Sequence, residues 1–293
     1  MRITLKQLKV FAAIAQHENM TVAAEQVALT QSAMSMALKE FESQLNKSLF
    51  DRHGKKMALN HTGRSLLPKV LQILHLAREI EYQAGIETLA GQLRIGASST
   101  IGNYLAPKLI AEFLTDNPQI DIDLKVANTR QVIEDVLQFR LDIGLIEGLC
   151  DHPQIDRRVW LEDELVIVSG KTHAIVQQSH IRINDLDEEN WILREQGSGT
   201  REIFTHAIQE HFQPKSVLEI GTSEAIKAAV KTGFGLSCLS KLTIETELAH
   251  GELIQVPLAE LDLKRQFFII KHRSQMSRDL VSAFEQKLQE LKP

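Results

Sequence analysis

Hydrophobic positions near the start of the chain recur with helical spacing. Two stretches show it, and each predicts an amphipathic structure. The first predicts a helix over 4–17, and its apolar positions are Leu5, Leu8, Phe11, Ala12, Ile14 and Ala15. The second, over 21–45, predicts two short helices joined by a tight turn. The later helix of this pair begins at Thr30, whose hydroxyl can accept from free N–H groups of the first turn. Its apolar face comprises Ala33, Met34, Ala37, Leu38, Phe41 and Leu45.

The polar face of that last helix opens with uncharged side chains, at Gln31, Ser32 and Ser35. Small hydroxyl and amide groups at a helix N-terminus are what base edges in a DNA major groove require, since Gln can pair with adenine and Ser can donate or accept. An ordinary amphipathic surface helix carries polar residues in the same places. The helix by itself therefore leaves both interpretations open.

Residues 49–60 have the pattern of two short extended segments around Gly54, with Arg52, Lys55 and Lys56 at the turn. A cationic β-wing beside a polar-tipped helix would contact DNA phosphates next to the groove. The three predicted helices and the wing support one another. They predict a winged helix-turn-helix DNA-binding domain over 1–61.

A longer helical pattern follows, from Thr62 to about Thr88, and its apolar positions alternate spacings of four and three. This heptad seam predicts a linker helix over 62–90 that pairs with a second chain, because so wide an apolar face should not stay in water. A two-fold dimer would present two recognition helices to two half-sites. The seam comprises Leu66, Val70, Ile73, Ala77, Ile80 and Ala84, and it is widened by Leu67, Leu71 and Leu74.

From Gly91 onward, strand and helix patterns alternate, which predicts the α/β class. Strands over 93–97, 120–126 and 141–147 with helices over 100–115 and 131–140 form a βαβαβ set, hence an open parallel sheet. In a second set, strands lie over 164–170, 191–194, 217–220 and 236–239, and helices over 200–212, 223–231 and 241–249. A closing strand over 266–271 and a helix over 278–291 return to the first set. The prediction is a two-lobed effector domain over 91–293, with lobe I about 91–162 and 267–293 and lobe II about 163–266.

A cleft between such lobes is the expected ligand site, because ligands of open α/β sheets bind at strand carboxyl ends and helix N-termini. Hydroxyl groups and glycines gather at these places and suit a small anion or the carboxylate of a metabolite. The candidates are Ser98, Ser99, Thr100, Asn128, Thr129, Glu147, Gly197, Ser198, Gly199 and Thr200. Ser and Thr are also ordinary helix N-caps, and that alternative stays open for both hydroxyl stretches. Glu147 has two possible roles, as an acceptor for the ligand or as a partner of Arg194.

Charge and composition narrow the class of protein. Residues 1–66 hold nine Lys and Arg against five Asp and Glu, net +4, and the remainder holds 24 against 33, net −9. A basic module on an acidic body is typical of a DNA-binding protein with a regulatory domain. No apolar run reaches the roughly 18 residues of a membrane span, and the N-terminus has no signal-peptide pattern, so we expect a cytoplasmic protein without membrane contact.

No catalytic constellation emerges, and we predict that the chain is not an enzyme. Ser198 lacks G-x-S-x-G spacing, the histidines show no H-E-x-x-H, and Cys150 and Cys238 have no C-x-x-C spacing. We expect no cofactor besides a small-molecule or anion co-inducer. A solute-binding protein is the alternative on the same two-lobed scaffold, and the basic N-terminal module with no leader argues against it.

The first 65 residues resemble the winged helix-turn-helix of the LysR-type transcriptional regulators. The matching residues are Leu5, Leu8, Phe11, the run Ala23-Ala24 to Leu29-Thr30-Gln31-Ser32-Ala33-Met34-Ser35, Leu49-Phe50-Asp51-Arg52 and Leu59-Asn60-His61-Thr62-Gly63-Arg64. The family's linker helix and two-lobed, periplasmic-binding-protein-like effector domain extend the resemblance over the whole chain. It implies a homodimer or homotetramer that binds a double-stranded DNA operator, contacts RNA polymerase if it is an activator, and responds to a small co-inducer. The implied DNA-contacting residues are Gln31, Ser32, Ser35, Lys39, Arg52, Lys55 and Arg64.

Shorter motifs resemble the CysL/YeiE branch of that family, which is associated with sulfur metabolism. They are Ala97-Ser98-Ser99-Thr100-Ile101-Gly102-Asn103-Tyr104, Ile146-Glu147-Gly148, Trp160 to Leu165, Trp191 to Glu195, Gly197 to Glu202 and Ser223 to Lys227. The branch implies a sulfite-like anion as co-inducer. Two departures matter. Met36 stands where the family often has a cation, and Asn60 replaces the usual Thr, which makes Thr62 the expected cap of the linker helix.

Overall fold

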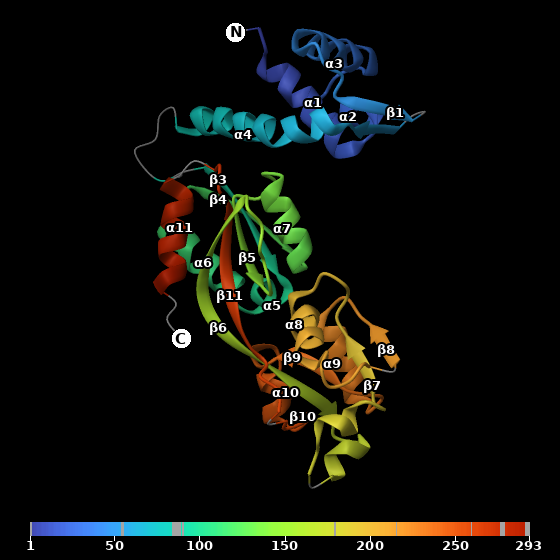
Figure 1. Ribbon diagram of the computed structural model, residues 1–293. Coiled ribbons are helices and arrows are strands. Elements are labelled where there is room, and N and C mark those ends of the chain that lie inside the picture. Colours follow the sequence, from blue (N-terminus) through green and yellow to red (C-terminus); the bar gives the residue numbers. More distant parts are fainter. Residues whose placement is uncertain are drawn as a thin grey trace. The chain divides into compact units, whose positions relative to one another are not determined.

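A computed structural model describes residues 2–53, 56–83, 89, 91–178, 180–214, 216–258, 260–275 and 279–290 (Figure 1). The chain divides into two compact units, one built mainly from residues 1–91 and the other mainly from residues 92–293. In the described part of the chain, no helix is both long and apolar enough to cross a bilayer.

The first unit is a winged helix-turn-helix, as predicted. Its elements are α1 (Leu5–His17), α2 (Met20–Gln26), α3 (Gln31–Leu45), β1 (Phe50–His53), β2 (Lys56–Leu59) and α4 (His61–Gln83). Thr30 caps α3 by accepting from the N–H of Ala33 at 3.2 Å. The wing is an antiparallel β1–β2 hairpin in which Phe50 pairs with Leu59. The rings of Phe11 and Phe41 pack at 5.8 Å between centroids in the core of this unit.

The start of α4 differs from the prediction. Asn60, not Thr62, caps the helix, because its side-chain oxygen accepts from the N–H of Gly63 at 2.9 Å. Asn is as good an N-cap as Thr, so its presence at this position did not displace the helix start. The predicted stretch 84–88 lies outside the described residues.

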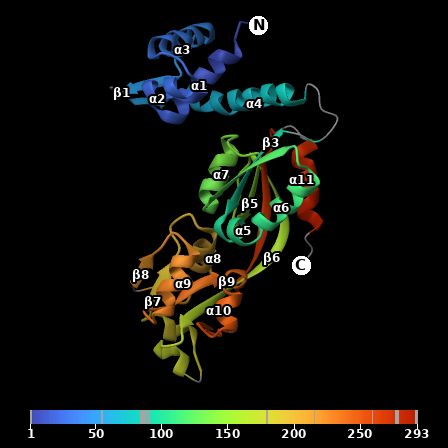
Figure 2. The same ribbon diagram turned by 180° about the vertical axis from the view of Figure 1, so that it is seen from behind.

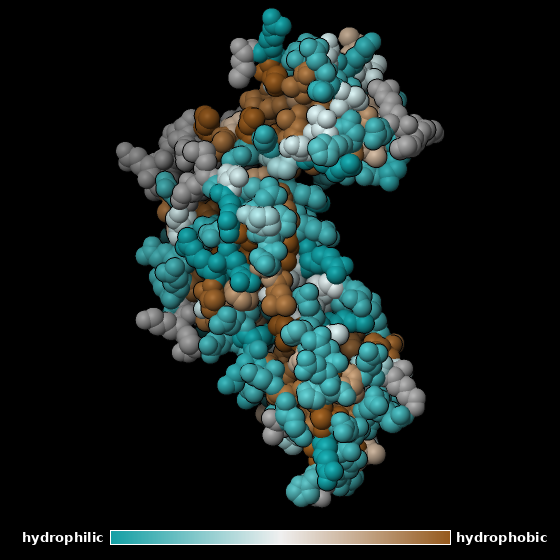
Figure 3. All heavy atoms as spheres, viewed as in Figure 1, coloured by the Kyte–Doolittle hydropathy of each residue, from teal (hydrophilic) through white to brown (hydrophobic). Residues whose placement is uncertain are grey.

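The apolar seam of α4 is partly buried in the helix-turn-helix core and partly exposed to solvent. Val70 and Leu74 are buried with the helix-turn-helix core, so the first half of the helix is not an isolated spacer as the heptad pattern suggested. Ile73 and Ile80 are 47% and 71% exposed. Figure 3 shows hydrophobic residues gathered over α1 and α4 on one face of this unit.

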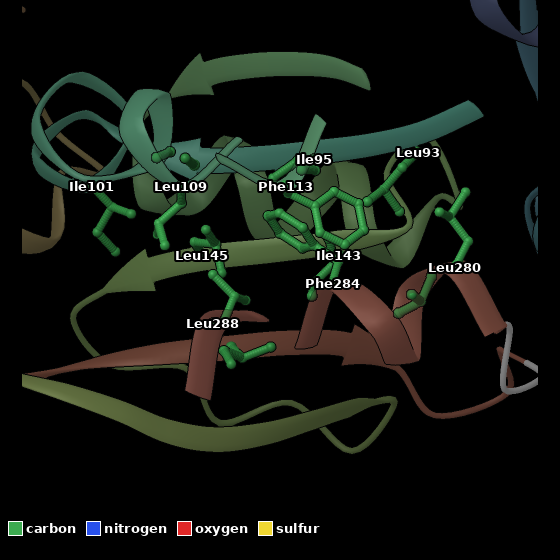
Figure 4. Packing of buried hydrophobic residues seen from close by; sticks show 14 of the residues in the cluster. Leu93, Ile95, Ile101, Leu109, Phe113, Ile143, Leu145, Leu280, Phe284 and Leu288 are labelled. Atoms are coloured by element: carbon green, nitrogen blue, oxygen red, sulfur yellow. The ribbon is translucent and has the colours of Figure 1, made fainter. Parts of the chain in front are cut away.

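Lobe I of the second unit is a sheet with helices on both faces. Its elements are β3 (Gly91–Ser98), α5 (Ser99–Tyr104), α6 (Ala106–Asp116), β4 (Ile120–Ala127), α7 (Thr129–Leu137), β5 (Ile143–Glu147), β6 (Ile155–Gly170), β11 (Lys264–His272) and α11 (Asp279–Glu290). Helices α6 and α11 cover one face of the sheet and α7 the other (Figures 1 and 2). Strands β3 and β5 are parallel, and β11 returns antiparallel between β5 and β6. Phe113 and Phe284 meet edge to face at 5.2 Å in the core (Figure 4).

One helix predicted over 100–115 is two helices, α5 and α6, that meet at Leu105. Pro107 explains the break, because proline has no N–H to donate and its ring clashes with the carbonyl four residues earlier. The short α5 consequently ends at Tyr104.

Lobe II is organised around the second half of β6. The remaining elements are η1 (Ala174–Gln177), η2 (Ile183–Leu186), β7 (Asn190–Leu193), α8 (Gly199–Ile208), β8 (Ser216–Glu219), α9 (Ser223–Lys231), β9 (Ser237–Ser240), η3 (Lys241–Thr243), α10 (Glu245–Ala249) and β10 (Leu253–Gln255). Strands β9 and β10 pair antiparallel with β6, and β7 pairs parallel with β8. Trp191 is fully buried here against Phe204 and Phe212.

One long strand is common to both lobes. Strand β6 pairs with β11 up to Glu164 and with β9 from Leu165 onward, so one strand serves both sheets (Figure 1). The prediction gave only its second half, over 164–170. The β6–β11 register shifts between Phe267 and Phe268, opposite Trp160, whose indole N–H donates to the carbonyl of Leu288 at 2.8 Å.

Candidate functional site

The predicted DNA-contacting residues of α3 lie on its accessible side. Gln31, Ser32 and Lys39 are exposed and Ser35 is half-buried, whereas the opposite side is buried. Arg64 is exposed, and its guanidinium donates to the carbonyl of Leu59. The side chain of Arg52 and the whole of Lys55 lie outside the described residues. Their roles in DNA binding stay predictions.

The hydroxyl groups that follow β3 surround a buried carboxylate. Ser98 donates to Oε2 of Glu147, and Thr100 donates to Oε1 at 3.3 Å. The backbone N–H of Glu147 donates back to Ser98 Oγ at 3.3 Å. Ser98 is the N-cap residue of α5 but its side chain makes no capping hydrogen bond. The ordinary N-cap interpretation is therefore wrong at Ser98, because its hydroxyl donates to the Glu147 carboxylate instead of accepting from the first turn of α5.

The same carboxyl-terminal end of β5 is in backbone contact with lobe II. The carbonyl oxygen of Glu147 accepts from Thr129 Oγ1 at 2.7 Å. A Cβ added at Gly199, the first residue of α8, would overlap that carbonyl oxygen. The N–H of Arg130 donates to the carbonyl of Gly197 at 3.1 Å. The glycines thus permit a close approach between the lobes, in addition to any approach to a ligand.

Arg265 is the central side chain of the site, although it was not among the predicted effector residues. Its Nη1 donates to Thr200 at 2.9 Å and its Nη2 to Thr100 at 3.3 Å, so one guanidinium holds a hydroxyl from each lobe. Its Nε donates to Asp163 at 2.6 Å, and Asp163 also accepts from Ser240 at 2.8 Å. An arginine within an apolar strand, before Phe267 and Phe268, was the signal that could have revealed it.

Arg194 forms a second buried cationic group. It pairs with Glu195, at 2.8 Å from Nε, and donates from Nη2 to Ser99 of lobe I at 3.0 Å. It does not hold Glu147, which was one predicted alternative. Burial raises the pKa of Glu195, but hydrogen bonds from Arg194 and its charge lower it, with help from Asn128, and the net shift of the pKa is downward. Glu195 is therefore ionised at neutral pH.

Ser198 is the N-cap residue of α8, is only 1% exposed, and makes no capping hydrogen bond through its side chain. Thr222 shows what a capping hydroxyl does in the same lobe, since it accepts from the N–H of Ala225 at 3.3 Å at the start of α9. The hydroxyl of Ser198 is thus not engaged in stabilising its own helix.

Another polar contact between the lobes lies at Tyr104. Its hydroxyl donates to Glu224 and accepts from Lys227 at 3.1 Å, and Lys227 also pairs with Glu247 at 2.9 Å. Burial lowers the pKa of Lys227, but the hydrogen bonds that its ammonium donates to Glu224, Glu247 and Tyr104 raise it, and the net shift of the pKa is upward. Glu224 and Lys227 belong to the Ser223 to Lys227 motif, for which no role was predicted.

A cavity of about 770 Å³ adjoins the hydroxyl cluster, and Asp163 and Arg265 line it. Its other walls come from both lobes, for example Leu149, His206 and Phe268. None of the predicted effector residues lines this cavity, and Arg265 connects it to the hydroxyls of Thr100 and Thr200.

Neither cysteine is suited to reaction or metal binding. Cys150 and Cys238 are both buried thiols, and burial raises the pKa of Cys238 to about 12. Among the residues that the structure describes, no group of three His, Cys, Asp or Glu side chains is arranged to hold a metal ion.

Comparisons with known proteins cover both units. A family model described as "Bacterial regulatory helix-turn-helix protein, lysR family" matches residues 5–64, and one described as "LysR substrate binding domain" matches residues 87–292. The uncharacterized HTH-type transcriptional regulator YeiE of Escherichia coli (strain K12) is 45% identical over 275 residues, 93% of this chain and 92% of that protein. The HTH-type transcriptional regulator CysL of Bacillus subtilis (strain 168) is 34% identical over 266 residues, 90% of this chain and 89% of that protein. The structure of the Synechocystis PCC6803 CcmR regulatory domain in complex with 2-PG has a TM-score of 0.63 and 29% identity, covering 68% of this chain and 96% of that one.

Proposed function

Because the chain belongs to the LysR family of transcriptional regulators, we propose that a small oxyanion such as sulfite is the co-inducer that controls its binding to operator DNA. The effector domain is a small-molecule domain of that family, and the homologues are named regulators without an enzyme among the family matches. The solute-binding alternative is not favoured, since the helix-turn-helix is part of the matched family.

The observation that carries the proposal is the buried hydroxyl cluster between the lobes. Thr100 of lobe I and Thr200 of lobe II both accept from Arg265, which directs their hydroxyl protons away from the guanidinium. An oxyanion placed there would accept from hydroxyls of both lobes and lie near a fixed positive charge. Its binding would therefore depend on how the lobes meet.

Glu147 limits which oxyanion fits. Its carboxylate already accepts from Ser98 and Thr100, so a fully deprotonated anion would meet a like charge at the same hydroxyls. Hydrogen sulfite carries a proton, and it can donate that proton to Glu147 while its other oxygens accept from the hydroxyls. A protonated oxyanion is thus favoured over sulfate. The similarity to CysL supports a link with sulfur chemistry, and the 2-PG complex of CcmR supports a small-molecule site in such a domain.

Calorimetry on the full chain tests the effector site. We expect sulfite at neutral pH to bind more tightly than sulfate, and Thr100→Ala and Ser198→Ala each to weaken sulfite binding by about 1.5–3 kcal/mol, the cost of one hydrogen bond to a charged group. Thr115→Ala is the matched control, because its exposed hydroxyl bonds to Ala111 on α6 and serves no ligand. Unchanged sulfite affinity in both site variants would remove the site as proposed.

A homodimer completes the proposed function. The exposed Ile73 and Ile80 of α4 are available to pair with the same helix of a second chain. Two α3 helices would then contact two operator half-sites, either as a dimer or as a tetramer of two dimers. An activator of this kind contacts RNA polymerase at the promoter and acts in the cytoplasm. Sedimentation of an Ile73→Glu, Ile80→Glu double variant should show loss of the dimer. A variant dimer of unchanged stability, or a native chain that is already monomeric, contradicts pairing through α4.

A further inference from the structure

One large apolar side chain lies on the exposed side of α3. Met36 is 73% exposed, whereas Met34 on the same helix is fully buried. Helices place successive residues about 100° apart, so Met36 lies about 40° around the axis from Ser32 and about 60° from Lys39. It therefore occupies the middle of the face opposite the buried Leu38 and Phe41.

The exposure of Met36 argues against a purely structural role for this side chain. A side chain 73% exposed contributes little to the core of this unit. Its neighbour Ser32, four residues earlier on the same face, has a short hydroxyl side chain that does not cover the methionine. The longer neighbour Lys39 is charged, so Met36 is an apolar group that this face presents. A flexible, polarizable thioether adapts to an apolar surface that it contacts.

We propose that Met36 contacts the 5-methyl group of a thymine in the operator and so sets a base preference that Gln31, Ser32 and Ser35 do not. The thymine methyl is the one apolar group that base pairs display in the major groove. This inference rests on α3 entering that groove. Because Met36 carries no charge, its contribution concerns which sequence is bound, and the electrostatic attraction to phosphates comes from other residues.

The test uses the full native chain and a duplex that the chain selects from a random-sequence pool. Each thymine of that duplex is replaced singly by uracil, which removes only the methyl group, and Kd is measured at one fixed salt concentration. We expect at least one replacement to weaken binding about fourfold per contacted methyl, the conversion of ~0.8 kcal/mol for a buried apolar carbon. In Met36→Ala the ratio of the two affinities at that position should fall to about one.

Two further variants sharpen the result. Met36→Leu keeps an apolar contact and should retain discrimination against uracil. Met36→Gln keeps the length without the apolar end and should lose it, which preserves the test if the alanine variant folds poorly. Leu5→Ala is the matched control, because Leu5 is 44% exposed on α1 and should leave the ratio unchanged.

The outcomes separate this inference from the wider function. A native chain that binds thymine and uracil duplexes equally, or a Met36→Ala chain with an unchanged ratio, overturns the role of Met36 while leaving DNA binding in place. A native chain that selects no duplex at all overturns groove binding by α3 and this inference with it.

Discussion

The exposed face of α3 and the buried cluster between the lobes use the same side-chain chemistry in opposite ways. Gln31 and Ser35 make no side-chain hydrogen bond within the described part of the chain, and Ser32 bonds only to Thr30. In the cluster, the hydroxyls of Ser98 and Thr100 are already engaged with Glu147. The exposed face of α3 leaves its polar groups available to a partner, whereas the buried cluster uses its hydroxyls in contacts within the protein.

The two regions therefore respond to a bound partner in different ways. Gln31 and Ser35 need not leave an internal partner to bind DNA, so their loss should change affinity and not stability. A ligand at the cluster must replace existing contacts, which couples occupancy to the way the lobes meet. Substitutions that change DNA affinity without changing the free energy of unfolding, or the reverse, therefore test this difference between the two regions.

The largest effect is expected at Arg265. Arg265→Ala leaves Asp163 buried without its cation and removes a donor from Thr100 and Thr200, so we expect the free energy of unfolding of the effector domain to fall by about 3–5 kcal/mol. Urea denaturation measures it. Arg158→Ala on the same sheet is the control, since this side chain is 58% exposed and its loss should cost no more than about 0.5 kcal/mol. Equal small losses in both would mean that the cluster does not hold the lobes.

A smaller effect, on affinity alone, is expected at Gln31. Gln31→Ala should weaken binding to the selected operator by about 1–3 kcal/mol, because a base contact is lost, while binding to unrelated duplexes stays unchanged. Anisotropy titrations with the two duplexes measure this, alongside thermal unfolding that should not move. A matching loss on unrelated DNA would place Gln31 at a phosphate instead of a base.

The smallest effect distinguishes two hydroxyls of lobe II. Thr222→Ala should lower the free energy of unfolding by about 1 kcal/mol, because the cap of α9 is lost. Ser198→Ala should change it by about 0.5 kcal/mol or less, since Ser198 does not cap α8. Denaturant melts of the two variants give the comparison, and a cost at Ser198 equal to that at Thr222 would return it to an ordinary capping role.

The sequence allowed the first unit to be predicted in detail because its determinants are local. The cap at Thr30 and the apolar spacing of α3 lie within a few turns of one another. Arg265 could not be placed in the same way, since its partners Thr100 and Asp163 are 165 and 102 residues away along the chain. The predicted hydroxyls came from their positions after strands, but their engagement with Glu147 depends on how β3 and β5 pair.

The errors have local physical causes as well. Asn60 caps α4 because its side chain serves as well as the expected threonine, and Pro107 divides a helix that the apolar spacing alone would continue. Strand β6 was predicted at half its length, because its first half is mostly exposed or half-buried and lacks the continuous apolar run of its second half.

The two indoles of the chain occupy different lobes. Trp191 is fully enclosed, while Trp160 is half-buried at the irregularity of β6 and tied to the last helix. Each lobe thus carries its own fluorophore, one in a dry setting and one partly in water. Paired Phe replacements would give an emission channel for each lobe, so that a titration could reveal which lobe changes first without any attached dye.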